Sequence, residues 1–189
     1  MRSRIVEEAA DQIFLSGARM MNLDRVREQV GASKSQIYHY FSSKDDLIAA
    51  VLDFQSERVI NGQMPELDAI ESVDTLRRWC TKIVATADTY GTIGGCPLGS
   101  LANECAGEGG VLAGALALHL ENWRKKIEQG LIQMRDSGAL SLAFDPQALS
   151  QLFLAAIQGG LLWAKTFKST EMLRVSLNQL VDQIEAAAT

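Results

Sequence analysis

Residues Lys34 to Tyr40 carry the side chains in this sequence that are best suited to contact a nucleic acid. Glutamine can form two hydrogen bonds with adenine, serine can bond several bases, and lysine can reach guanine or phosphate. Ile37 and Phe41 share one side of a helix over this stretch, so the polar and aromatic side chains occupy the remaining surface. The segment therefore predicts a helix that lies in the major groove of double-stranded DNA.

Tyr38, His39 and Tyr40 admit two interpretations. Their polar atoms can bond phosphate groups and so hold a protein in register on the duplex. Aromatic residues at helical spacing are also common in protein cores, which leaves a half-buried aromatic cluster as the alternative. Lys44 follows at the start of the next predicted helix, where its charge and the free backbone N–H groups can meet the same phosphate backbone.

A second short periodic segment, Leu23–Val30, precedes this one, and Gly31-Ala32-Ser33 separates the two. Two short helices joined by such a turn are typical of a helix-turn-helix. Asn22 and Ser33 stand directly before the two segments, where their side chains can accept backbone N–H groups of the first helical turn. The spacing therefore predicts a capped helix-turn-helix.

Helical periodicity dominates the rest of the chain, and no alternating strand pattern occurs, so we predict an all-α fold. Gly17 is expected to end the first helix in a left-handed conformation, which glycine adopts at little cost. Ser43 and Asp46 match a capping box, and the pattern lapses over residues 62–72, which predicts a hinge. The predicted helices are Ser3–Ser16, Leu23–Val30, Lys34–Phe41, 43–61, Val73–Tyr90, Leu98–Cys105, Val111–Asp136, Pro146–Lys168 and Glu171–Ala187.

Composition narrows the function classes. The 189 residues carry a formal net charge of −5, and residues 1–53 hold seven Lys or Arg against eight Asp or Glu. This balance disfavours a protein that coats nucleic acid without sequence preference. Asp24 also lies near the expected DNA surface, so we expect a modest dependence of DNA affinity on salt. No apolar run approaches the roughly 20 residues of a membrane span, and residues 1–8 are charged, which predicts a cytoplasmic protein without a membrane partner.

No residue set in the sequence predicts a catalytic or metal centre. Three cysteines without CxxC spacing and only two histidines argue against a disulfide framework, a zinc site or any other cofactor. Cys96 is expected to be a small buried apolar residue, with a redox or electrophile sensor as the alternative. The glycine-rich stretch 91–99 lacks the ending of a phosphate-binding loop and predicts a helix break. With no nucleophile and base in a recognisable set, the chain is not expected to be an enzyme.

The segment from Ile5 to Leu52 resembles the DNA-binding domain of the tetracycline-repressor (TetR) family. The family pattern appears here as Gly31-Ala32-Ser33, then Ile37-Tyr38-His39-Tyr40-Phe41, then Lys44 and Leu47. The resemblance implies that Lys34, Ser35 and Gln36 face bases and that Tyr38, His39, Tyr40 and Lys44 face phosphates. It places Asn22 beside the DNA backbone. With Ser33 at the start of the reading helix, these residues make up the predicted DNA-binding set.

The resemblance divides the chain into a DNA-binding domain, residues 1–53, and a larger C-terminal helical domain, residues 54–189, for ligand binding and dimerisation. Within the latter, Gly95-Cys-Pro-Leu-Gly99, Leu101-Ala-Asn-Glu104 and Gln158-Gly-Gly-Leu-Leu162 resemble an effector-responsive subgroup of the family. A ligand pocket would be lined by large apolar groups and a few polar ones. The candidates are Trp79, Tyr90, Leu98, Asn103, Glu104, His119, Trp123, Phe153 and Trp163.

The last two predicted helices are expected to form a homodimer. Leu149, Leu152, Phe153 and Ala156 form one apolar stripe, Gly159-Gly160 permit close helix approach, and Leu173, Leu177, Leu180, Val181 and Ile184 form a second stripe. Internal packing of both stripes is the alternative. Two helices from each subunit would make a four-helix interface around a two-fold axis.

The functional expectation is a ligand-responsive transcriptional repressor. It would bind a palindromic operator in double-stranded DNA as a dimer and be released by a small-molecule effector of unknown identity. An activator or a ligand-independent regulator with the same DNA-binding domain stays open. A small helical enzyme or carrier is the alternative from another class.

Overall fold

The computed structural model describes residues 1–105 and 110–187 of the chain. Its regular structure over these residues is entirely helical and contains no strand, in agreement with the predicted all-α fold. The chain forms two compact units, residues 1–59 with 97–120 and residues 60–96 with 121–189. Among the described residues, no helix is both long and apolar enough to cross a bilayer.

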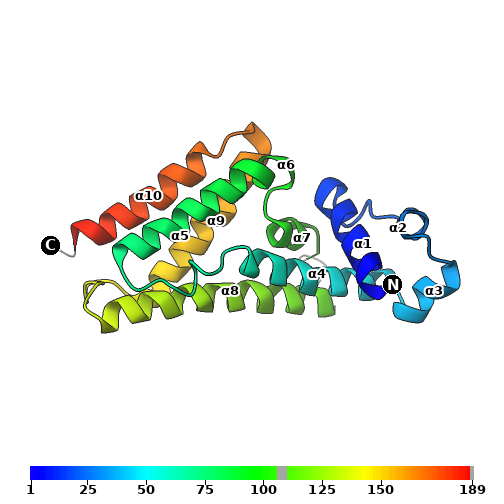
Figure 1. Cartoon of the computed structure of the whole chain (residues 1–189), viewed down its shortest axis with the longest axis horizontal. Helices are drawn as coiled ribbons and strands as arrows, with labels where there is room; N and C mark the ends of the chain where they lie inside the picture. Colours follow the sequence, from blue (N-terminus) through cyan, green and yellow to red (C-terminus); the bar gives the residue numbers. More distant parts are fainter. Residues whose placement is uncertain (106–109, 188–189) are drawn as a thin grey trace. The chain divides into compact units, whose positions relative to one another are not determined.

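The first unit contains the N-terminal helices (Figure 1). Its elements are α1 (Arg2–Ser16), α2 (Leu23–Val30), α3 (Lys34–Tyr40), most of α4 (Lys44–Asn61), α7 (Pro97–Cys105) and the first part of α8 (Gly110–Asp136). Val26 and Val30 of α2 are buried together with Ile37 and Phe41, as expected for the core of a helix-turn-helix. The guanidinium of Arg2 lies over the Phe41 ring, 5.2 Å from its centroid, so α1 covers the end of α3.

Short-range hydrogen bonds set the starts of these helices. Asn22 caps α2 by accepting the N–H groups of Asp24 and Arg25, as predicted. Ahead of α4, the Ser43 hydroxyl accepts the Asp46 N–H at 3.1 Å. The Asp46 carboxylate, however, accepts the backbone N–H and the hydroxyl of Ser42. The predicted capping box is therefore only half formed, since the carboxylate bonds one residue further upstream.

Gly17 ends α1 as predicted but in a different conformation. Its φ of 90° is positive, whereas its ψ of 160° lies outside the left-handed helical region. The chain consequently leaves α1 in an extended direction. Glycine suits these backbone angles, and a Cβ at this position would lie 2.7 Å from a carboxylate oxygen of Glu104 on α7, so the Glu104 side chain would have to shift.

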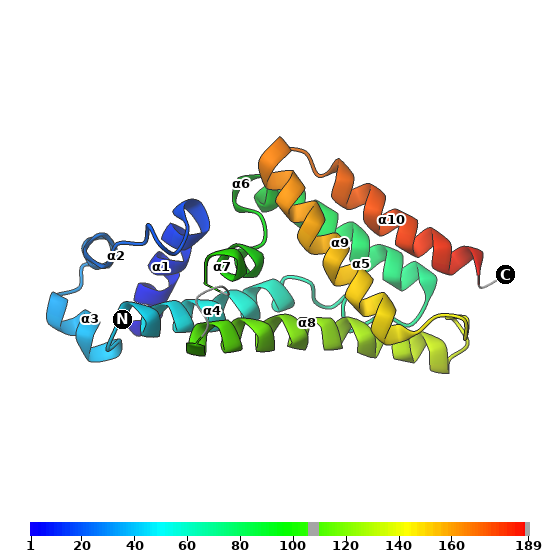
Figure 2. The same ribbon diagram turned by 180° about the vertical axis from the view of Figure 1, so that it is seen from behind.

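The second unit contains α5 (Val73–Thr86), a π-helix η1 (Ala87–Gly91), the short α6 (Thr92–Gly94), α9 (Pro146–Phe167), α10 (Glu171–Ala186) and the rest of α8. Helices α5, α9 and α10 lie side by side in both views (Figures 1 and 2).

Two features of this unit bear on the sequence predictions. The predicted helix Val73–Tyr90 changes from α to π geometry at Ala87. The glycine-rich stretch breaks the helix at Gly95, which has a φ of +74°, as expected.

The apolar stripes predicted for the dimer are largely internal to the subunit. Leu149 and Phe153 of α9 are 5% and 0% exposed, and the α10 residues Leu173, Leu177, Val181 and Ile184 are each 0% exposed. The prediction that these side chains contact a second subunit is wrong, because α9 and α10 bury them against their own unit. Gly160 does permit close helix approach, since a Cβ there would lie 2.7 Å from the Cβ of Leu173 on α10.

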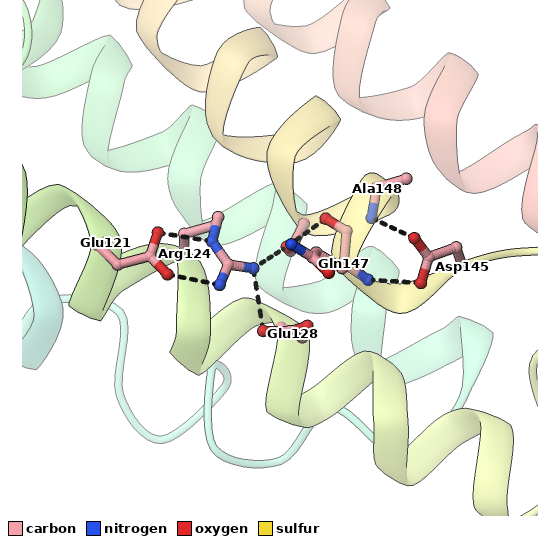
Figure 3. A network of polar contacts seen from close by, with 7 residues as sticks. Glu121, Arg124, Glu128, Asp145, Gln147 and Ala148 are labelled. Carbon is pink, nitrogen blue, oxygen red and sulfur yellow. Dashed lines mark hydrogen bonds and ion pairs between the residues drawn. The ribbon is translucent and has the colours of Figure 1, made fainter.

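A charged network joins α8 to the start of α9 (Figure 3). The guanidinium of Arg124 bonds both carboxylate oxygens of Glu121, at 2.8 and 2.7 Å, and one oxygen of Glu128 at 2.9 Å. It also donates to the Ser150 hydroxyl of α9 at 2.8 Å. The hydrogen bond from Arg124 holds the pKa of the Glu121 carboxyl below its ordinary value. Because Arg124 is 8% exposed, removing either acid would leave its buried charge poorly compensated.

The three cysteines are buried, as expected for small apolar residues. Burial raises the pKa of the Cys80 thiol to about 12, which suppresses the nucleophilic thiolate. The sulfur of Cys96 accepts a hydrogen bond from the Gln158 side chain at 3.4 Å. In the part of the chain that the structure describes, no group of three or more His, Cys, Asp or Glu could hold a metal ion.

Candidate nucleic-acid interface

The turn before helix α3 and the capping box at its start set where the helix begins. Gly31 ends α2 in the left-handed conformation, with φ 68° and ψ 30°. The Ser33 hydroxyl then accepts the Gln36 N–H at 3.1 Å, while the Gln36 side-chain oxygen accepts the Ser33 N–H at 2.8 Å. This reciprocal capping box starts the helix, and the burial of Ile37 fixes which side faces inward.

The other side of α3 is open to solvent. Lys34, Ser35, Gln36 and His39 are exposed, and the Tyr38 and Tyr40 side chains are 52% and 38% exposed. Tyr38 and Tyr40 thus keep part of their surface accessible to a phosphate although each is partly covered. The His39 and Tyr40 rings meet edge to face, 5.0 Å between centroids, on this exposed surface. Donor and acceptor groups of the required types are thus presented outward from one short helix.

A hollow of about 310 Å³ opens between the start of α2, the exposed side of α3 and the start of α4. Four residues of the predicted DNA-binding set line it, namely Asn22, Lys34, Tyr38 and Lys44. The structure thus brings together residues that are 22 positions apart in sequence. Ser33, Ser35, Gln36, His39 and Tyr40 are not among its lining residues and remain on the neighbouring surface of α3.

The charge around the hollow favours an anion. Arg27, Lys34 and Lys44 supply three positive charges and Asp24 one negative charge, so the formal sum is +2. The Arg27 guanidinium lies 3.5 Å from the Asp24 carboxylate and 3.4 Å from that of Glu28, which offsets part of the acidic charge near this surface. The hollow is therefore locally cationic in a domain that is acidic overall, and a phosphate group suits it.

Sequence reasoning missed Met21 and Arg27 as lining residues. Arg27 falls in the last turn of α2, which the family pattern quoted above does not cover. A basic residue one turn after Asp24 on the same helix was a usable signal, because residues three apart are neighbours on a helix surface.

Glu104 lies against the turn between α1 and α2. Its carboxylate accepts the backbone N–H of Arg19 at 3.1 Å, and the Lys44 ammonium donates to the carbonyl of the same residue at 3.2 Å. One peptide segment is thus bonded by α7 on one side and by α4 on the other. Since a lysine has three N–H donors, Lys44 can keep this bond and still meet a phosphate.

The remaining ligand candidates of the first unit do not form one group. Leu98 is fully buried, Asn103 is exposed, and the His119 ring nitrogen Nε2 lies 2.9 Å from the Asp53 carboxylate. The His119 contact joins α8 to α4. Whether any of these residues touches an effector stays a prediction.

In the second unit, three aromatic candidates belong to one buried cluster. The indole N–H groups of Trp79 and Trp123 both donate to the side-chain oxygen of Gln63 at 3.1 Å. Phe153 meets Trp79 edge to face at 5.8 Å, and all three rings are at most 1% exposed. No sequence signal pointed to Gln63, because its partners lie 16 and 60 positions away.

The other two candidates of this unit are surface residues. Tyr90 is 61% exposed on η1, and Trp163 is 39% exposed and stacks on Phe167 at 4.1 Å. Tyr90 and Trp163 thus differ from the three rings around Gln63, which are buried. Their role in binding an effector also stays a prediction.

Comparison with known proteins agrees with this arrangement. Residues 5–51 match the family described as bacterial regulatory proteins, tetR family, and residues 72–180 match the tetracyclin repressor-like C-terminal domain. The chain is 25% identical over 180 residues to the HTH-type transcriptional repressor DhaR of Mycobacterium sp. (strain GP1), covering 92% of this chain and 86% of that protein. It is 23% identical to the transcriptional regulator AcuR of Cereibacter sphaeroides, covering 85% and 74%.

Solved structures show the same fold. The reduced form of NemR from E. coli superposes with a TM-score of 0.85 at 22% identity, covering 97% of this chain and 96% of that one. A regulatory protein TetR from Rhodobacter sphaeroides gives a TM-score of 0.84 at 20% identity, covering 95% and 96%. The helix-turn-helix fold and the family match of residues 5–51 place this chain in the class of helix-turn-helix DNA-binding proteins. This chain is a member of the TetR family of transcriptional regulators.

Proposed function

We propose that this protein is a dimeric transcriptional repressor that binds a palindromic operator and is released by a small-molecule effector. The observation that carries the proposal is the outward-facing polar surface of α3 beside the cationic hollow. Residues 1–53 would bind DNA in the cytoplasm, with Lys34, Ser35 and Gln36 toward bases. Tyr38, His39, Tyr40, Lys44 and Asn22 would contact the phosphate backbone.

Exposed apolar side chains on α9 and α10 support the dimer. Leu152 and Leu162 of α9 are 52% and 60% exposed, and Val175 of α10 is 50% exposed. Phe167 near the end of α9 and Met172 near the start of α10 are 58% and 41% exposed. Large exposed apolar side chains gathered on two neighbouring helices are costly in water and are typical of a subunit interface. In this proposal the exposed side of α9 and α10 makes the subunit contact. Leu152 of the predicted stripes lies on this side, whereas Leu149 and Phe153 are buried within the subunit.

The effector is proposed to bind within residues 54–189 and to change the separation of the two α3 helices. An effector shifts this balance only through its different affinity for the two states. Repression is preferred over activation because DhaR, at 25% identity, carries the name of a repressor. Activation from the same operator contacts is the second candidate.

The DNA-binding part is tested by selecting duplexes from a random pool with the purified protein and measuring affinity by fluorescence anisotropy. We expect one palindromic consensus. Lys34→Ala should lower its affinity severalfold, because a charge beside the hollow is lost. Lys125→Ala, which removes an exposed lysine on α8, is the matched control and should leave affinity unchanged. Failure of the wild-type protein to enrich any sequence at low salt would contradict the proposal.

A further inference from the structure

In the protein without DNA, the side-chain amide of Gln36 is oriented by a hydrogen bond to Ser33. Its side-chain oxygen accepts the Ser33 backbone N–H at 2.8 Å, while the Gln36 N–H is bonded to the Ser33 hydroxyl. A backbone N–H can only donate, so the side-chain atom that faces it is the oxygen and not the nitrogen. The amide NH₂ group is therefore the end of the Gln36 side chain that has no bond to Ser33.

This orientation changes which base Gln36 can recognise. The familiar two-bond contact of glutamine with adenine needs the oxygen to accept from N6 and the nitrogen to donate to N7. Here one lone pair of the oxygen is held by the Ser33 N–H. Turning the amide so that its oxygen and nitrogen both face one base would pull the oxygen away from Ser33 and break the capping box at the start of a seven-residue helix. The expectation from residue type alone, in which glutamine bonds adenine, is thereby disfavoured.

An NH₂ group that acts only as a donor matches guanine. In the major groove guanine presents two neighbouring acceptors, N7 and O6. Adenine presents a donor beside its single acceptor, cytosine presents a donor, and thymine has one acceptor beside a methyl group. We propose that Gln36 is a specificity-determining residue that selects guanine over adenine through its amide NH₂ while its oxygen keeps the capping box closed. The inference rests on the proposed operator binding by α3.

Three variants separate reading from capping. Gln36→Glu keeps an oxygen for the Ser33 N–H but removes both donors, whereas Gln36→Ala removes the cap and the donors together. Ser33→Ala removes the hydroxyl half of the capping box and keeps the Gln36 amide. Each variant and the wild-type protein are used to select operator duplexes, and circular dichroism checks that each variant is folded.

We expect the wild-type protein to select a consensus with a G·C pair at the position where both Gln36 variants lose preference. Ser33→Ala should bind operator DNA more weakly, because Ser33 belongs to the predicted DNA-binding set, but it should keep the preference for G·C at that position. Replacing that guanine with 7-deazaguanine, which lacks the N7 acceptor, should weaken wild-type binding by about tenfold, the size of one discriminating base contact. The same replacement should leave binding by Gln36→Glu nearly unchanged. Comparing two duplexes with one protein cancels the general repulsion between the introduced carboxylate and DNA.

Two results would overturn the inference. In the first, the wild-type consensus has an A·T pair at the position where the Gln36 variants lose base preference, which would show that Gln36 leaves the cap and bonds adenine. In the second, the Gln36 variants lose affinity but keep base preference at every position, which would show that Gln36 only starts the helix. Absence of selection by the wild-type protein is a separate outcome, which refutes the proposed operator binding itself.

Discussion

Replacing Gly160 with alanine should loosen the packing of α9 against α10. The added Cβ would lie 2.7 Å from the Cβ and Cδ1 of Leu173 and 2.8 Å from its Cα. Carbon atoms in contact prefer roughly 3.5–4.0 Å, so the overlap is about 1 Å. Because one of the atoms is backbone, a new Leu173 rotamer cannot relieve the overlap and the two helices must separate.

The expected cost follows from two opposing effects. Overpacking of this kind typically costs about 1–3 kcal/mol. Alanine in a helix interior recovers about 1 kcal/mol relative to glycine. We therefore expect a net destabilisation of about 0–2 kcal/mol. Gly114→Ala is the matched control, since a Cβ there would meet nothing within 4 Å and only the helix-propensity gain applies.

Urea unfolding at one fixed protein concentration measures the difference between the two variants. A fixed concentration is needed because association stabilises a folded dimer by mass action. Gly160→Ala should unfold at lower urea than the wild-type protein and Gly114→Ala at higher urea, with a difference of about 1–3 kcal/mol between them. Equal stabilisation by both substitutions would refute the close approach of α9 and α10.

Five further outcomes are expected from the contacts and the burial of these residues. Gln63→Leu should destabilise the fold by about 2–4 kcal/mol in urea unfolding, because two buried indole N–H groups lose their acceptor. Cys80 should resist a thiol reagent at pH 8 in the folded protein and react once urea is added, judged by mass spectrometry of a variant whose other cysteines are serine. As pH rises from 9 toward 12, unfolding should release the Cys80 proton, so stability should fall over this range relative to that of Cys80→Ala. Glu104→Ala should speed hydrogen exchange of the Arg19 amide, and an unchanged rate would argue against the bond between them. Leu162→Lys should shift the protein to monomers in sedimentation and weaken operator binding, whereas dimers of full stability would place the interface elsewhere.

The helix-turn-helix was readable from sequence because its determinants are local. Asn22 and Ser33 cap α2 and α3 through bonds that span two or three residues. The buried side of α3 follows from the helical spacing of Ile37 and Phe41, and its predicted end at Phe41 differs from the observed end at Tyr40 by one residue. Neighbours in sequence supply all of these interactions, so the distant parts of the chain were not needed to infer them.

The hydrogen-bond partners of several polar groups could not be named from residue type. Glu104 was a ligand candidate by residue type, but its bonded partner is the backbone of Arg19, 85 positions away. The carboxylate of Asp46 accepts the backbone N–H of Ser42, whereas the capping-box motif predicted a bond with Ser43. Gln36 is only three residues from its partner, yet the type of the residue does not tell that its oxygen bonds the Ser33 N–H and its nitrogen stays unbonded to Ser33.

The sequence by itself determined where the helices lie and which surface of α3 is polar, because helical period and capping act over a few residues. Only the tertiary structure decided which apolar side of α9 and α10 is internal. Leu152 and Phe153 are adjacent in sequence and equally apolar, yet the first is exposed and the second is buried. Periodicity reports that a helix has apolar residues, whereas the choice among apolar sides depends on how closely the neighbouring helices can approach, as at Gly160.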